Sequence, residues 1–220
     1  MLMKGNEMKS IETVIKDSLN QSISLDEYFA LLGNFVERQS TSGPDQSEDL
    51  IYYTKLNNQR SKRLNKTIRI PDNLESHMRE SIREKQTWLI ITESWCGDAA
   101  QIIPLIARIA EVSPSIDVRM VLRDENLDLM DNFLTKGGRS IPKVIILNDK
   151  QEVLDTWGPR PQAAQEVYDS WKNDPDRVPY KEFHVTLQKW YLEDKGLNTF
   201  QEIAEILQRI AKKSKTTVPA

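Results

Sequence analysis

The sequence is very poor in cysteine. Cys96 is the only one among 220 residues, which excludes an intrachain disulfide and any metal site built from several cysteines of one copy. A single free thiol is typical of proteins in a reducing compartment. The first residues, MLMKGNEMKSIETV, lack the apolar run of a signal peptide. We therefore expect the protein in the cytoplasm.

Long hydrophobic runs and a strong net charge are also lacking. No segment approaches the roughly 18 apolar residues that identify a membrane-spanning helix, and the formal charge is only −3. A charge this small provides no general attraction to nucleic acid or to a membrane, so we expect neither as a partner. Hydrophobic residues make up 39% of the chain, which indicates a folded domain rather than a disordered chain.

Histidine is scarce as well, with two residues in the chain. His77 and His184 both fall in helix-like segments, which disfavours a hydrolytic site in which a histidine activates Cys96. Acidic residues are missing from the basic stretch at 58–69. We interpret that stretch as a solvated helix face rather than a binding patch.

Helical patterns occupy both ends of the chain. An apolar stripe with Ser24 as N-cap predicts a helix at 24–37, and similar patterns predict helices at 47–64, at 180–196 and from Phe200 onward. We expect the stripes of the last two helices to pack in the core.

The pattern changes at residue 88, where short apolar runs begin to alternate with helical ones. Buried strands are predicted at 88–92 and 117–122, further strands at 143–148 and 152–158, and helices at 101–112, 125–135 and after 162. The last two strands are joined by Asp149 and Lys150, which indicates an antiparallel hairpin. Two parallel βαβ steps that end in a hairpin and a helix predict a small α/β sandwich.

Three features of this region resemble the thioredoxin-like superfamily. They are Trp95-Cys96-Gly97 where a strand meets a helix, Pro104 within that helix, and the segment GGRSIPK at 137–143. Gly158, after the hairpin, also lies where thioredoxins tend to have glycine. Each feature alone is weak, but together and in this order they are specific. The W-C-G-D-A stretch and the long helical leader also resemble a bacterial branch of thioredoxin-family proteins.

The resemblance implies a three-layer α/β/α sandwich with a mixed sheet at residues 86–172. Residues 1–85 then form a helical N-terminal extension, and residues 173–220 form a C-terminal helical extension and tail. The resemblance also implies that Pro142 follows a cis peptide bond opposite Cys96, where the backbone of Ile141 can pair with an extended substrate.

Cys96 is the predicted reactive residue. A thiol at a helix N-terminus gains stabilisation of its thiolate from unpaired backbone N–H groups, which lowers its pKa. Glu93 and Asp98 oppose this effect because nearby negative charge disfavours a second anion. Arg139 offsets these acids if it points inward. The residues expected to contact the substrate are Trp95, Gly97, Asp98, Ile141 and Pro142.

Two parts of an ordinary thioredoxin site are missing. Ala99 replaces the second cysteine, so no intramolecular thiolate can release a mixed disulfide from Cys96. Ile90 stands where thioredoxins commonly bury an aspartate that assists proton transfer. The sequence therefore argues against a dithiol reductase.

Several functions stay open. The first is monothiol disulfide exchange with a protein or small-molecule partner; it needs no resident cofactor or metal, and glutathione is the candidate co-substrate. The second is a non-catalytic protein- or peptide-binding module. The third, an iron–sulfur cluster shared between two copies, is disfavoured because Asp98 and Ala99 follow Cys-Gly where monothiol glutaredoxins have Phe and Ser. Neither an enzyme activity nor an oligomeric state follows from the sequence alone.

Overall fold

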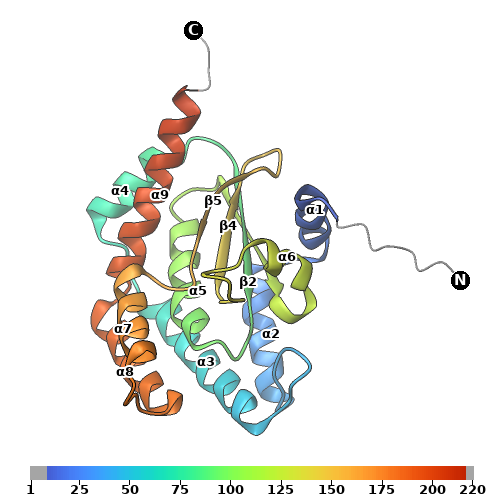
Figure 1. Ribbon diagram of the computed structural model, residues 1–220. Helices are drawn as coiled ribbons and strands as arrows, with labels where there is room; N and C mark the ends of the chain where they lie inside the picture. Colours follow the sequence, from blue (N-terminus) through green and yellow to red (C-terminus); the bar gives the residue numbers. More distant parts are fainter. Residues whose placement is uncertain (1–8, 217–220) are drawn as a thin grey trace, which may run out of the picture.

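The computed structural model describes residues 9–216, which surround one central sheet (Figure 1). Within these residues, no helix is both long and apolar enough to cross a membrane. The elements in chain order are α1 (Ile11–Gln21), β1 (Ile23–Ser24), α2 (Leu25–Glu37), α3 (Glu48–Thr67), α4 (Asp72–Ser81), β2 (Gln86–Thr92), α5 (Gly97–Ala110), β3 (Ile116–Leu122), the 3-10 helix η1 (Arg123–Glu125), α6 (Leu127–Asn132), β4 (Lys143–Leu147), β5 (Val153–Trp157), α7 (Gln162–Asn173), α8 (Tyr180–Asp194) and α9 (Leu197–Thr216).

The sheet has the strand order β1-β3-β2-β4-β5. Strand β2 lies in the centre, parallel to β3 and antiparallel to β4, and β4 forms the expected antiparallel hairpin with β5. The short strand β1 pairs with β3 at the edge and was not predicted. The prediction of a second parallel βαβ step is wrong, because β4 runs against β2.

The short helix α6 explains the direction of β4. It has 6 residues and spans about 9 Å at about 1.5 Å per residue, whereas the 7 residues of β3 span about 23 Å. The chain therefore stays at one end of the sheet between β3 and β4. The helix predicted at 125–135 is shorter in the structure, where α6 spans Leu127–Asn132. The 3-10 helix η1 precedes its N-terminal end, and a turn that pairs Thr135 with Gly138 follows its C-terminal end.

Helices cover both faces of the sheet. In Figure 1, α1 and α6 lie on one side, and α5, α3, α4 and α9 lie on the other. Helix α3 packs along α5, and α4 packs along α9. The predicted architecture, an α/β fold with a mixed sheet and additional helices at both ends, is confirmed.

Local capping fixes the start of α2 where the sequence predicts it. The Ser24 hydroxyl accepts from the Glu27 backbone N–H at 3.2 Å, and the Glu27 carboxylate accepts from the Ser24 N–H at 2.7 Å. This reciprocal pair satisfies two backbone donors that a helix otherwise leaves unpaired.

The C-terminal helices contribute to the core as expected. Phe200, Ile203 and Leu207 on α9 are fully buried, as is Leu187 on α8 at 1% exposure. Helix α9 runs to Thr216 and includes the start of the predicted tail, whose last residues, 217–220, lie outside the described part of the chain.

Candidate functional site

Cys96 lies in the turn between β2 and α5, and it caps the N-terminus of α5. Its Sγ accepts the backbone N–H of Ala99 at 3.4 Å and donates to the backbone carbonyl of Ile141 at 3.3 Å. The thiol is free and 7% exposed. Two of the predicted site segments, the W-C-G turn and the Ile141–Pro142 pair, are therefore in direct contact.

The Ile141–Pro142 peptide bond is cis, and it immediately precedes β4. Because β4 begins at the end of the sheet where β2 finishes, this segment lies opposite Cys96. Gly158 supports it from the far side of the hairpin. Its φ is +109°, and a Cβ added there would lie 2.3 Å from the Pro142 carbonyl oxygen. A side chain at position 158 would thus strike the backbone of the Pro142 segment.

Asp98 is buried and fully engaged. Its carboxylate forms an ion pair with the Arg160 guanidinium, whose Nε lies 3.2 Å from Oδ2, and it accepts the Tyr191 hydroxyl at 2.9 Å. The Arg160 guanidinium also lies over the Tyr168 ring, 4.4 Å from its centroid. No local sequence pattern indicates this partnership, because Arg160 and Tyr191 are 62 and 93 residues away from Asp98.

The electrostatic surroundings make Cys96 a weak acid. Burial is the largest cause and Asp98 the next, and together they raise the pKa of the thiol to about 12. The backbone N–H groups of Ala99 and Asp98 and the charge of Arg160 lower the pKa by less. The predicted thiolate stabilisation by the helix N-terminus is therefore present but outweighed.

The two residues expected to tune Cys96 from a distance point elsewhere. Glu93 is fully buried, accepts from the Ser42 hydroxyl, and accepts from the Asp124 N–H at 2.8 Å; burial raises the pKa of its carboxyl. Arg139 lies at the surface, where it forms an ion pair with Asp131 at 2.6 Å. The inward orientation of Arg139 is not observed, and the cation acting on Cys96 is Arg160.

Trp95 is half-buried beside the cysteine. The guanidinium of Arg123 lies 4.9 Å from the centroid of its ring, at cation–π distance. Ala99 is 1% exposed, and Ile90 is fully buried within β2. The positions of the missing cysteine and aspartate are thus filled by packed apolar side chains.

Helix α8 covers the start of α5. A Cβ added to Gly97 would lie 2.5 Å from His184 Nε2 on α8. His184 is buried, and its pKa is lowered by that burial and by the charge of Arg60. The sequence pattern predicts that His184 lies in a C-terminal helix, but it does not indicate that this helix contacts the W-C-G turn. His77, the other histidine, is half-buried on α4.

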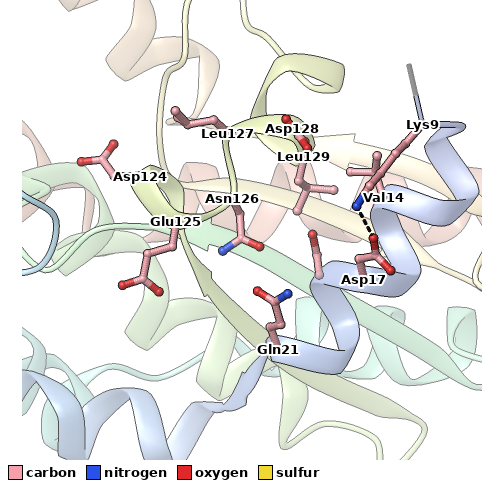
Figure 2. Close-up of a pocket in the computed structure, with 11 residues that line it drawn as sticks. Lys9, Val14, Asp17, Gln21, Asp124, Glu125, Asn126, Leu127, Asp128 and Leu129 are labelled. Carbon is pink, nitrogen blue, oxygen red and sulfur yellow. Dashed lines mark hydrogen bonds and ion pairs between the residues drawn. The ribbon is translucent and has the colours of Figure 1, made fainter. Parts of the chain in front are cut away.

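A separate polar cavity of about 300 Å³ lies between α1 and the η1–α6 segment (Figure 2). Lys9 and Asp17 form an ion pair at 2.6 Å on one wall, and Asp124, Glu125 and Asp128 contribute carboxylates to its lining. None of the predicted site residues is among the residues that line this cavity. This cavity is therefore separate from the residues around Cys96.

Comparison with known proteins identifies the family and the fold. The chain matches the thioredoxin family model over residues 43–172. A protein of unknown function from Pseudomonas aeruginosa, PA1234, has a similar structure, with a TM-score of 0.54 and 18% identity, covering 70% of this chain and 84% of that one. An HIV epitope-scaffold aligns with a TM-score of 0.52 and 17% identity, covering 84% of this chain and 98% of that one. No curated protein matches the sequence.

Proposed function

Because the chain belongs to the thioredoxin family, we propose that Cys96 performs monothiol disulfide exchange. Its substrate is a disulfide of a protein or a small molecule, and glutathione is the thiol that completes the cycle. A function that depends on a free thiol and on glutathione requires a reducing compartment, so we propose a cytoplasmic location.

The contact between Cys96 and the Ile141–Pro142 segment carries the proposal. Sγ lies at the first turn of α5, within hydrogen-bond distance of the Ala99 N–H and of the Ile141 carbonyl. A thiolate formed here keeps the Ala99 N–H as a donor and has the Arg160 charge nearby. A disulfide that approaches Cys96 meets the backbone of Ile141 beside the attacking sulfur.

The exchange proceeds in two balanced steps. The Cys96 thiol loses its proton to solvent, and the thiolate attacks one sulfur of the substrate disulfide, whose S–S bond breaks as the other sulfur leaves with the electron pair. With Ala99 in place of a second cysteine, the resulting mixed disulfide waits for a glutathione thiolate. That thiolate attacks the substrate sulfur, forms a new disulfide with it and releases Cys96 as a thiolate, which regains a proton.

The proposal is tested by incubating the folded protein with oxidised glutathione and measuring its intact mass. We expect one glutathione adduct, removed again by reduced glutathione, and no adduct on Cys96→Ser. Folded protein that stays unmodified after prolonged incubation, while the urea-unfolded chain is modified, would contradict exchange at this site.

The burial of Cys96 favours a second candidate, a non-catalytic binding module. A thiol that is 7% exposed, with a pKa of about 12, is almost entirely protonated at neutral pH. If the protein is such a binding module, we expect Cys96→Ser to bind a protein partner as well as the wild type does. Reductant should then not release that partner. Partners recovered only as disulfide adducts would rule this candidate out.

A further inference from the structure

One face of α8 lies directly on the first turns of α5. His184 approaches the backbone of Gly97, as described above, and one turn later Gln101 donates to the Gln188 side-chain carbonyl at 2.7 Å. Because residues four apart share one face of a helix, α8 presents both side chains to the same region. On this face His184 is buried and Gln188 is half-buried, whereas Val185 on the outer side of α8 is 68% exposed.

Asp98 attaches the rest of the C-terminal region to the same place. Its carboxylate binds Tyr191 from α8 and Arg160 from the segment before α7. Arg160 lies in turn over Tyr168 of α7. A single buried carboxylate, two residues after Cys96, therefore holds both α7 and α8.

Helices α7 and α8 are joined to each other by aromatic packing. The rings of Trp171 and Phe183 are stacked with centroids 4.5 Å apart, and the Trp171 indole N–H donates to the Val178 carbonyl at 2.8 Å. Aromatic stacking of this kind stabilises the contact by more than the burial of apolar surface alone. The two helices thus form a hairpin, which we call the α7–α8 hairpin (residues 162–194).

The contact between α8 and α5 is not fully satisfied. The Nε2 atom of Gln188 is buried without a hydrogen-bond partner. A buried polar group that lacks a partner opposes the closed arrangement, because it regains a hydrogen bond from water when the surface opens. Specific contacts therefore hold α8 against α5, while the unpaired Gln188 Nε2 lowers the stability of this closed arrangement.

We propose that the α7–α8 hairpin is an autoinhibitory cover, which slows the reactions of Cys96 until a partner displaces α8. This inference rests on the proposed exchange, because it describes how that reaction is controlled. Opening lets solvent reach the first turn of α5 beside Cys96, and hydration favours the thiolate. The partner needed is one that competes for the surface around Gly97 and Asp98 while presenting a disulfide to Cys96.

The variant Gly97→Ala tests the cover directly. The new methyl group would lie 2.5 Å from His184 Nε2, and the rings of Tyr53 and Tyr180, with centroids 5.3 and 6.0 Å away from that of His184, restrict where His184 can move. We expect Cys96 alkylation and amide hydrogen exchange in α8 both to rise about tenfold, which corresponds to about 1.4 kcal/mol in the opening equilibrium.

Two further variants make the result specific. The double variant Gly97→Ala with His184→Ala removes the overlap, and we expect α8 exchange to return toward the wild-type rate. Gln188→Ala removes the hydrogen bond to Gln101 from the other side, and it should accelerate both α8 exchange and alkylation. Two outcomes would overturn the cover. In the first, both Gly97→Ala and Gln188→Ala are alkylated at the wild-type rate. In the second, alkylation becomes faster while the amides of α8 stay protected from hydrogen exchange.

Oxidised glutathione separates this inference from the proposed function. Fast alkylation of Gly97→Ala without any glutathione adduct would refute the exchange reaction and retain the cover. A wild type that forms the adduct as fast as Gly97→Ala would refute the cover and retain the exchange reaction.

Discussion

At the scale of single residues, Cys96 shows how burial and a helix N-terminus compete. The helix supplies N–H donors to the sulfur, and Arg160 supplies a positive charge. The hydration that a thiolate loses on burial costs more than these groups return, and repulsion from the neighbouring Asp98 carboxylate adds to that cost. The resting form of Cys96 is therefore a neutral thiol that donates to the Ile141 carbonyl.

The pH dependence of Cys96 alkylation follows from this balance. Since the pKa of the thiol is raised to about 12, the thiolate population grows about tenfold per pH unit throughout the range below that value. We expect the logarithm of the alkylation rate to rise linearly from pH 7 to about pH 10 in the folded protein. The unfolded chain, as control, should level off near the ordinary value of about 8.5. An inflection below about 8.5 in the folded protein would contradict the high pKa.

Gly158 provides a second prediction at this scale. A strained backbone conformation costs about 1–3 kcal/mol. We expect Gly158→Ala to lower the free energy of unfolding by more than this, because its methyl group would also clash with the Pro142 carbonyl. Gly137→Ala is the matched control, since φ there is +77° and the space around it is open. Urea unfolding of both variants measures the difference. Equal losses would show that the contact with Pro142 is unimportant.

At the scale of elements, the attachment of α8 to α5 depends on few polar contacts. The Tyr191 hydroxyl is buried and donates to a carboxylate, and such bonds contribute about 1.5–3 kcal/mol. The Arg160 ion pair lies beside it, 10% and 8% exposed at its two side chains. Loss of one partner in such a buried cluster is more costly than loss of an exposed pair.

We predict that Tyr191→Phe destabilises the protein by about 1.5–3 kcal/mol, because Asp98 loses a donor that water replaces poorly in a buried position. Tyr180→Phe on the same helix is the control, since Tyr180 is 50% exposed, and we expect a change within about 0.5 kcal/mol. Chemical denaturation gives both values. A Tyr191→Phe protein as stable as the control would mean that the hydroxyl contributes nothing to holding α8.

The same contacts show what could be predicted from the sequence. The W-C-G turn at a strand-to-helix junction, the hairpin and the apolar stripes are local patterns, and each was predictable. Arg160 and Tyr191 reach Asp98 from distant segments, and neither leaves a mark in the local pattern. The direction of β4 was missed for a related reason, because it depends on a helix whose length is set by its flanking turns.

At the scale of the whole molecule, the N-terminal helices are joined to the site by a buried cluster of hydroxyl groups. The Ser94 Oγ, two residues before Cys96, lies 3.0 Å from Thr41 Oγ1 and 2.9 Å from Thr54 Oγ1, and it accepts the Ser42 N–H at 2.9 Å. Asn57 donates to the Ser94 carbonyl at 3.0 Å. The turn that carries Cys96 is thus held by α3 and by the loop before it, so the N-terminal region and the sheet should unfold together.

Ser94→Ala tests this coupling. The substitution removes an oxygen that three buried groups contact. Thr41 and Thr54 keep their hydrogen bond to each other at 2.6 Å, whereas the Ser42 N–H loses its acceptor, so we expect a loss of about 1–3 kcal/mol in the free energy of unfolding. Ser170→Ala, on the exposed surface of α7, should change it by less than about 0.5 kcal/mol. Urea transitions followed by tryptophan fluorescence and by far-ultraviolet circular dichroism should coincide and shift together. If the two probes separate already in the wild type, or if Ser94→Ala is as stable as the wild type, the cluster does not couple the N-terminal helices to the sheet.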